Sequence, residues 1–162
     1  MHKILVPLDG SSHSLKALHI ACDLAHKYGA RVVLLYVATN DKPAEEILEL
    51  PIARKFSPEL QAELQNKPGD NAEPLTAAFA EHVGQQILKI AALRAERVGV
   101  DTQILAVATG DPAENILTAH KLTGASTIVM GSRGGKWSTL SSFGSVSHKV
   151  FALADCTCIS VK

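Results

Sequence analysis

The most informative part of the sequence runs Ile128-Val129-Met130-Gly131-Ser132-Arg133-Gly134, and nine residues later comes Gly144-Ser145. An apolar triplet, a glycine-bearing loop and then a helical pattern indicate a strand that turns into a helix. Glycine lets the backbone approach an anion closely, and the first turn of a helix offers unpaired N–H groups at the positive end of its dipole. Ser145 adds a hydroxyl donor. The segment therefore predicts a phosphate-binding loop, although its spacing matches neither Walker A nor the Rossmann glycine pattern.

Size and composition favour one domain with an aliphatic core. The chain has 162 residues, 46% of them hydrophobic and only 4% aromatic. Its 16 basic and 16 acidic residues cancel, which argues against a nucleic-acid-binding protein. No apolar run is long enough to cross a membrane, and no signal sequence precedes the first predicted strand. The three cysteines Cys22, Cys156 and Cys158 form no disulfide framework, so we expect a cytoplasmic protein.

Apolar segments that alternate with helical patterns predict an α/β fold. Continuous runs of Val, Ile and Leu indicate strands that are buried on both faces, which is typical of a parallel sheet covered by helices. Five strands are expected, the third of them only partially alternating: Lys3–Leu8, Arg31–Ala38, Thr102–Ala108, Thr127–Met130 and Cys156–Val161.

Four helices are expected between and after these strands. The first covers Ser12–Tyr28, with Ser11 or Ser12 as N-cap and Gly29 at its C-terminal end. The second covers Phe79–Val98. The third begins at Asp111-Pro112, where Asp111 serves as N-cap and proline fits the first turn. The last helix is expected to turn Val146, Val150 and Leu153 inward.

The segment Thr39–Ala78 interrupts this regular alternation. It holds five of the seven prolines and eight of the sixteen acidic residues, but only four of the sixteen basic ones. A strand-to-helix connection of this length is unusual in a compact domain. We expect a surface excursion with short helical pieces near Ala44–Leu50 and Pro58–Leu64. Two interpretations stay open: a variable solvated insertion, or a lid or partner-binding surface.

Asp9 follows the first predicted strand, within Leu8-Asp9-Gly10-Ser11. In open α/β sheets, ligands bind at the carboxyl ends of strands where the strand order reverses. If the first and fourth strands are neighbours, Asp9 faces the glycine loop across one crevice. A carboxylate there can accept hydrogen bonds from a ribose hydroxyl or a base amine, and it can also simply form a turn with Gly10.

The sequence resembles the universal stress protein family, in particular its ATP-binding branch. The resemblance is carried by Gly131-x2-Gly134-x9-Gly144-Ser145, by Ile4-Leu5-Val6-Pro7-Leu8-Asp9-Gly10-Ser11 and by the Gly110-Asp111-Pro112 turn. It covers the chain outside Thr39–Ala78. It implies one domain over residues 1–162, with a five-stranded parallel sheet in the order 3-2-1-4-5, helices on both faces, and a fold like that of the adenine nucleotide alpha hydrolases.

The resemblance also implies an ATP site. Independently of the resemblance, Mg²⁺ can arrive with ATP, held mainly by phosphate oxygens. In such a site the adenosine would lie near the first and second strands, and the phosphates near the glycine loop. The implied nucleotide-binding residues are Pro7, Asp9, Val37, Met130, Gly131, Arg133, Gly134, Gly144, Ser145 and Val146. No catalytic residue and no metal-ligand motif is expected.

A homodimer that pairs through the fifth strand is implied in the same way. Two positions depart from the family pattern: Ser126 stands where the family commonly has Asp, and the fifth strand Cys156–Val161 is more polar. The polar strand can still pair through its backbone hydrogen bonds.

Three function classes follow from these observations. The first is an ATP-binding regulatory protein of the stress response, which acts by nucleotide-dependent shape or by binding an unidentified protein partner. The second is an enzyme, either a slow ATPase or a protein that phosphorylates itself at Ser138, Thr139, Ser141 or Ser142. The third is a nucleotide-free interaction protein that uses the acidic segment Thr39–Ala78.

Overall fold

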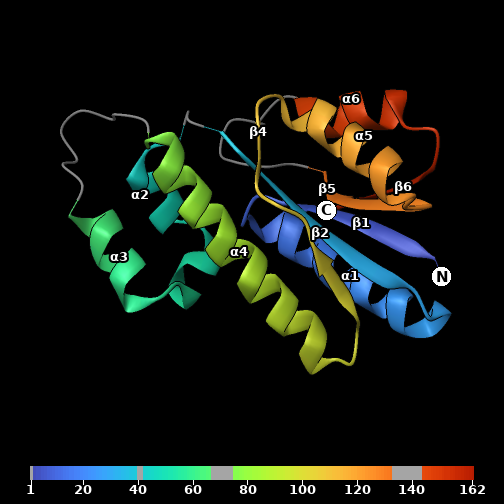
Figure 1. Cartoon of the computed structure of the whole chain (residues 1–162), viewed down its shortest axis with the longest axis horizontal. Helices are drawn as coiled ribbons and strands as arrows, with labels where there is room; N and C mark the ends of the chain where they lie inside the picture. The colour runs from blue at the N-terminus through green and yellow to red at the C-terminus, as the bar shows by residue number, and fades with distance from the viewer. Residues whose placement is uncertain (1, 40–41, 67–74, 133–143) are drawn as a thin grey trace.

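A parallel sheet runs through the centre of the molecule (Figure 1). The computed structural model describes residues 2–39, 42–66, 75–132 and 144–162. The strand order is β3-β2-β1-β5-β6, with the short β4 also paired to β2, and every pairing is parallel. The predicted single-domain α/β fold with a parallel sheet is thereby confirmed, but the sheet contains six strands where five in the order 3-2-1-4-5 were predicted. The strands are β1 (Lys3–Leu8), β2 (Arg31–Ala38), β3 (Thr102–Ile104), β4 (Ala108–Thr109), β5 (Thr127–Gly131) and β6 (Thr157–Val161).

Helices cover both faces of the sheet. Figure 1 shows α5 (Pro112–Thr123) and α6 (Ser145–Leu153) above the sheet, and α1 (Ser12–Tyr28) and α4 (Ala77–Arg97) below it. Between β2 and α4 lie α2 (Ala44–Leu48), the 3₁₀ turn η1 (Pro51–Lys55) and α3 (Pro58–Gln65).

Alternate residues of the central strands pack into two hydrophobic cores, one on each face of the sheet. Val6 and Leu34 pack in the larger core with α1 and α4, whereas Leu5, Val33 and Leu35 pack in the smaller core with α5 and α6. All five side chains are buried. The continuous apolar runs of β1 and β2 are thus explained by burial on both faces.

The predicted helix signals are found where the sequence places them. The hydroxyl oxygen of Ser11 accepts a hydrogen bond from the Ser14 N–H at 3.2 Å, and Gly29 ends α1 in the left-handed conformation with φ 61°. Asp111 Oδ1 accepts a hydrogen bond from the Glu114 N–H at 2.8 Å, with Pro112 in the first turn of α5. Local capping chemistry therefore sets where both helices begin.

The prediction of one continuous strand over Thr102–Ala108 is wrong. Leu34 pairs with Ile104 in β3, but Val37 pairs with Ala108 in β4, so the numbering offset between paired residues rises from 70 to 71. One extra residue is accommodated between the two pieces, as in a β-bulge. The strand is therefore split in two, and both pieces lie beside β2.

The inner face of the last helix also differs from expectation. Val150 is fully buried and Val146 packs against the smaller core, as predicted. Leu153, however, is 60% exposed. The helix ends at this residue, and Ser147 takes the second buried position.

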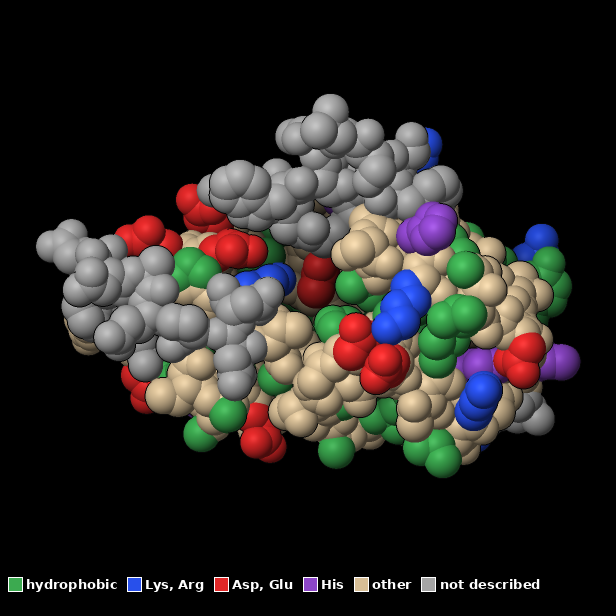
Figure 2. All heavy atoms as spheres, turned by 90° about the horizontal axis from the view of Figure 1, so that it is seen from above, with side chains coloured by type: hydrophobic (Ala, Val, Ile, Leu, Met, Phe, Trp, Pro, Cys, Tyr) green, Lys and Arg blue, Asp and Glu red, His purple; other side chains and the backbone are tan. Residues whose placement is uncertain are grey.

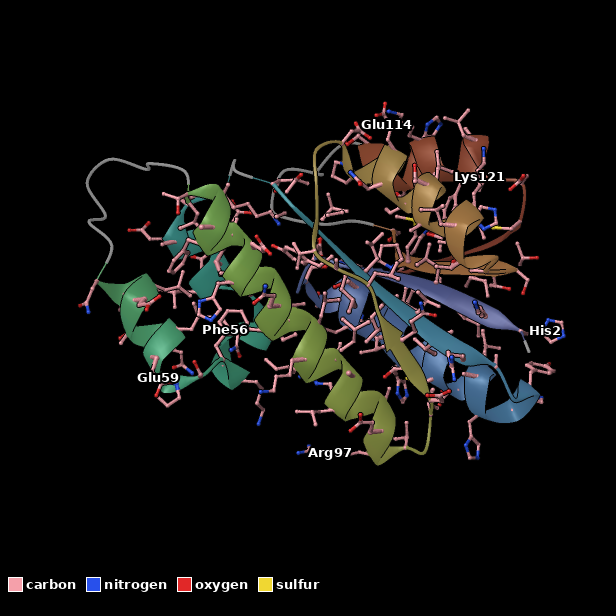
Figure 3. The ribbon with its side chains drawn as sticks, in the orientation of Figure 1. His2, Phe56, Glu59, Arg97, Glu114 and Lys121 are labelled. Atoms are coloured by element: carbon pink, nitrogen blue, oxygen red, sulfur yellow. The ribbon has the colours of Figure 1, made fainter. Side chains whose placement is uncertain are left out.

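The segment between β2 and α4 belongs to the larger core in its described part. Its apolar side chains are almost completely buried beside α1, α4 and the sheet: Ile47, Ile52, Phe56, Leu60, Leu64 and Leu75. Figure 3 shows Phe56 lying between this segment and α4, while Glu59 points outward. The expected helical pieces are present, but the expectation of a solvated surface excursion is wrong for these residues. Proline and acidic residues occupy the outer face and dominate the composition of the segment, so the composition did not indicate its buried apolar face.

Replacing Leu60 by alanine tests this packing. Leu60 is fully buried, so Leu60→Ala should lower the free energy of unfolding by about 2–5 kcal/mol in a urea titration. Glu63→Ala changes an exposed residue of the same helix and should stay within about 0.5 kcal/mol of the parent. Equal, small effects of both substitutions would contradict the packing described for α3.

Candidate functional site

A cleft of about 300 Å³ opens at the carboxyl ends of β1, β2 and β5. Neighbouring parallel strands end at the same edge of the sheet, and the chain leaves β1 and β5 toward opposite faces, which opens a crevice between their loops. Figure 2 shows a hollow near the middle of this side of the molecule, with an acidic side chain deep inside it. Among the residues that line the cleft, Asp9 and Lys42 carry charge.

Most of the predicted site residues meet in this cleft. Eight of them line it: Pro7, Asp9, Val37, Met130, Gly131, Gly144, Ser145 and Val146. The other two, Arg133 and Gly134, lie outside the described residues, as do the candidate acceptors Ser138, Thr139, Ser141 and Ser142. The structure thus brings together residues that are up to 139 positions apart in the sequence, from Pro7 to Val146. Their contact with a nucleotide remains a prediction.

Asp9 is held in place by the turn that follows β1. Its Oδ1 accepts a hydrogen bond from the Ser11 N–H at 2.9 Å, and the Ser14 hydroxyl donates to the Ser11 carbonyl at 3.0 Å. Within the described residues, no donor reaches Asp9 Oδ2. The structure shows the turn interpretation for one oxygen. The other oxygen is able to accept a ligand hydroxyl or amine, and that interpretation stays a prediction.

Gly10 connects this turn to the segment between β2 and α4. It has a φ of 80°, which strongly favours glycine. A Cβ placed there would lie 2.9 Å from Ile52 Cγ2 and 3.1 Å from Leu50 Cδ1. The β1–α1 turn therefore packs directly against η1, so the two segments share one rigid wall next to the cleft.

Gly131 is required by close packing as well as by the predicted anion site. A Cβ at this position would lie 2.8 Å from His13 Cβ and 2.9 Å from the His13 carbonyl carbon. The absence of a side chain lets the end of β5 press against the first turn of α1. Two loops of the cleft thus meet here, and the meeting point sets the width between them.

The start of α6 is tied to the end of β5 through Ser132. The Ser132 carbonyl accepts hydrogen bonds from the Gly144 N–H at 2.7 Å and from the Ser147 hydroxyl at 3.1 Å. The Ser132 N–H in turn donates to the Val161 carbonyl at 2.8 Å. Gly144, the N-cap of α6, has no side chain to cap the helix. Gly144, Ser145 and Val146 line the cleft, and the amides of this uncapped first turn are suited to binding an anion.

An ion-pair network joins α6 to the start of α5, the helix whose Pro112 lines the cleft. Lys149 Nζ lies 3.3 Å from Asp111 Oδ1 and 3.3 Å from Glu114 Oε1. The Glu114 N–H, together with Lys149, lowers the pKa of Asp111, and the two carboxylates raise the pKa of Lys149. Glu114 is labelled in Figure 3 at the start of α5. This network is exposed, so its contribution is mainly to orient the two helix starts.

Several lining residues were missed by the sequence analysis. Ser14 could have been found, because it is a polar residue in the first turn of the helix after β1. Thr39 could have been found in the same way, because it directly follows β2. Lys42 could not have been identified as a lining residue, because nothing in the sequence distinguishes it from the other charged residues of its segment. The complete set of missed lining residues is Leu8, Ser14, Leu35, Tyr36, Thr39, Lys42, Pro112, Ile116 and Ser147.

The described residues contain neither a candidate membrane-spanning helix nor a candidate metal-binding cluster. No helix among them is both long and apolar enough to span a bilayer. Across the same residues, no group of three or more His, Cys, Asp or Glu side chains is arranged to hold a metal ion.

Comparison with known families identifies the chain. A profile of the Universal stress protein family matches residues 1–162. The chain belongs to the universal stress protein family. It is 32% identical to Universal stress protein YxiE of Bacillus subtilis over 163 residues, covering 99% of each chain.

Solved structures share the fold at lower sequence identity. A universal stress protein from Archaeoglobus fulgidus in complex with dAMP has a TM-score of 0.67 and 16% identity, covering 100% of this chain and 98% of the other. A universal stress protein family member from Arabidopsis thaliana with AMP bound has a TM-score of 0.63 and 16% identity, covering 100% and 92%. These structures support the fold assignment of this family member.

Replacing Gly131 by alanine tests the junction between β5 and α1. The added methyl group meets the backbone of His13, which cannot rotate away, so Gly131→Ala should lower the free energy of unfolding by about 1–3 kcal/mol. Urea titration of the two proteins measures this difference. Thr127→Ala, at the half-buried start of the same strand, serves as the control and should cost less. An unchanged stability of Gly131→Ala would show that the two loops do not touch.

Proposed function

We propose that this universal stress protein binds ATP in the cleft and acts as a regulatory protein. The observation that carries the proposal is the convergence of eight predicted nucleotide-site residues on one cleft of about 300 Å³. Support also comes from two structures of the same fold, one in complex with dAMP and one with AMP bound. Both ligands are adenine nucleotides, which favours an adenine nucleotide for this chain.

The proposed pose follows the strand ends. Adenine lies against the backbone of Val37 at the end of β2, and Asp9 Oδ2 accepts a hydrogen bond from the ribose. The phosphates lie at the start of α6, where the amides of Ser145 and Val146 and the Ser145 hydroxyl donate to them. Arg133 and Gly134 complete the phosphate site in this proposal. Mg²⁺ accompanies ATP and is held mainly by phosphate oxygens.

The proposed output is a change in shape or in partner affinity. In the described part of the cleft the only carboxylate is Asp9, and it is half engaged in a turn. Such a site is suited to holding a nucleotide, since phosphoryl transfer calls for a positioned base or water-orienting group beside the phosphates. We further propose a cytoplasmic homodimer that pairs through the edge strand β6, and a protein partner that recognises the nucleotide-bound form.

Calorimetry on nucleotide-stripped protein tests the proposal. Titration with Mg-ATP should give saturable heat, and titration with AMP should show weaker binding because fewer phosphate oxygens meet the start of α6. A partner search with the ATP-bound protein would follow. Absence of binding to ATP and to AMP, verified by a second method, would remove the proposed function and would favour an interaction protein that works without nucleotide.

Gly144→Val tests the proposed phosphate cradle. Gly144 has φ −69° and ψ 156°, which any residue can adopt, so the fold should be retained. The valine side chain should block phosphate from the first turn of α6 and weaken ATP binding by at least about tenfold, which corresponds to about 1.4 kcal/mol. Ser126→Val, an exposed change at the opposite end of β5, is the control. Unchanged ATP affinity in a folded Gly144→Val protein would place the phosphates elsewhere.

A further inference from the structure

Lys42, which lies between β2 and α2, contributes a positive charge to the cleft. We propose that its ammonium group binds a phosphate of the nucleotide and so separates phosphorylated ligands from adenosine. This inference rests on the proposed function and adds to it a phosphate-recognition residue outside the glycine loop. Lys42 takes the part that a P-loop lysine plays elsewhere, since no Gly-Lys-Ser/Thr sequence follows the glycines here.

The charges of the cleft support this assignment. Lys42 and Asp9 are the charged residues among those that line it. Across the described residues, Lys42 has no hydrogen bond and no ion pair, including none to Asp9. Asp9 gives one oxygen to the Ser11 N–H. Lys42 thus lines the cavity with no described neighbour that compensates its charge, and a phosphate is the group of the proposed ligand that could do so.

A second electropositive part of the cleft is the start of α6. It contains Gly144 and Ser145 at the uncapped start of α6. Lys42 and this helix start come from segments about a hundred residues apart, yet both line the same cavity. A ligand that contacts both is favoured when it carries negative charge, because Lys42 and the start of α6 then both attract it.

The backbone of Lys42 is held by its neighbours. Pro43 precedes α2 as its N-cap, and Ala44 and Ile47 anchor the helix in the larger core. Leu50 and Ile52, which follow α2, pack near Gly10 on the β1–α1 turn. The backbone that follows Lys42 is therefore held by the larger core, so the cost of the contact with phosphate lies mainly in ordering the lysine side chain itself.

The test compares adenosine with Mg-ATP on three variants and the parent. Lys42→Met removes the charge and keeps the length of the side chain, and Lys42→Arg keeps the charge. Lys89→Met removes a lysine from the exposed face of α4, which does not line the cleft. Dissociation constants are measured by calorimetry at two salt concentrations, with free Mg²⁺ held constant.

We expect Lys42→Met to weaken ATP binding by about tenfold or more while adenosine affinity changes less than about twofold. Lys42→Arg and Lys89→Met should bind ATP like the parent. The salt dependence of ATP binding should be shallower in Lys42→Met than in the parent, because one screened charge pair is lost. Retained adenosine binding also verifies that each variant is folded.

Equal losses for adenosine and ATP in Lys42→Met would overturn the inference, since the lysine would then contact the base or ribose. Unchanged ATP affinity would overturn it as well. Either result leaves the proposed function standing, provided that the parent protein binds ATP. Failure of the parent protein to bind both ligands would instead overturn the proposed function together with this inference.

Discussion

The parallel pairing of β1 between β2 and β5 is the constraint on which the site depends. Six residue pairs fix β1 against β2, from Lys3 with Arg31 to Leu8 with Tyr36. The pairing of Ile4 with Thr127 and of Leu5 with Ile128 fixes β1 against β5. Because all three strands run in the same direction, their carboxyl ends meet at one edge. Buried residues on both faces stabilise this register, since a shift by one residue would exchange the two cores.

Two close contacts between neighbouring segments, both at glycines, shape the cleft at that edge of the sheet. Gly131 lets the end of β5 touch the first turn of α1, and Gly10 lets the β1–α1 turn touch η1. Ser132 then ties the start of α6 to the end of β5 and to Val161 of β6. Each wall of the cleft is thus fixed to the sheet or to a neighbouring wall. A preorganised cleft of this kind binds a ligand with little cost of ordering.

Much of the fold could be predicted from the sequence, because strands that are buried on both faces read as unbroken apolar runs. The caps at Ser11 and Asp111 are equally local, and both were predictable. The split between β3 and β4 was not, since one extra residue in a strand leaves no mark in the apolar pattern. The packing of residues 42–66 was obscured because prolines and acidic residues on the outer face dominate its composition, while Ile52 and Leu60 face the core.

The site was predictable where glycine spacing and strand ends signal it, and unpredictable where tertiary contact decides. The glycine loop and Asp9 follow strands directly, so their convergence could be inferred from topology. Lys42 lies four residues beyond β2 in a segment of mixed charge, where composition gives no indication that it lines the cleft. There is a second reason for glycine at position 131, namely its close contact with His13. No sequence pattern reveals that contact.

The central claim is that this cleft at the carboxyl ends of β1, β2 and β5 is the nucleotide site. A crystal structure of the protein grown with Mg-ATP tests it most directly. The account predicts adenine beside Val37 and phosphate oxygens within hydrogen-bond distance of the Ser145 and Val146 amides. Nucleotide bound at any other surface, with the cleft empty, would contradict it.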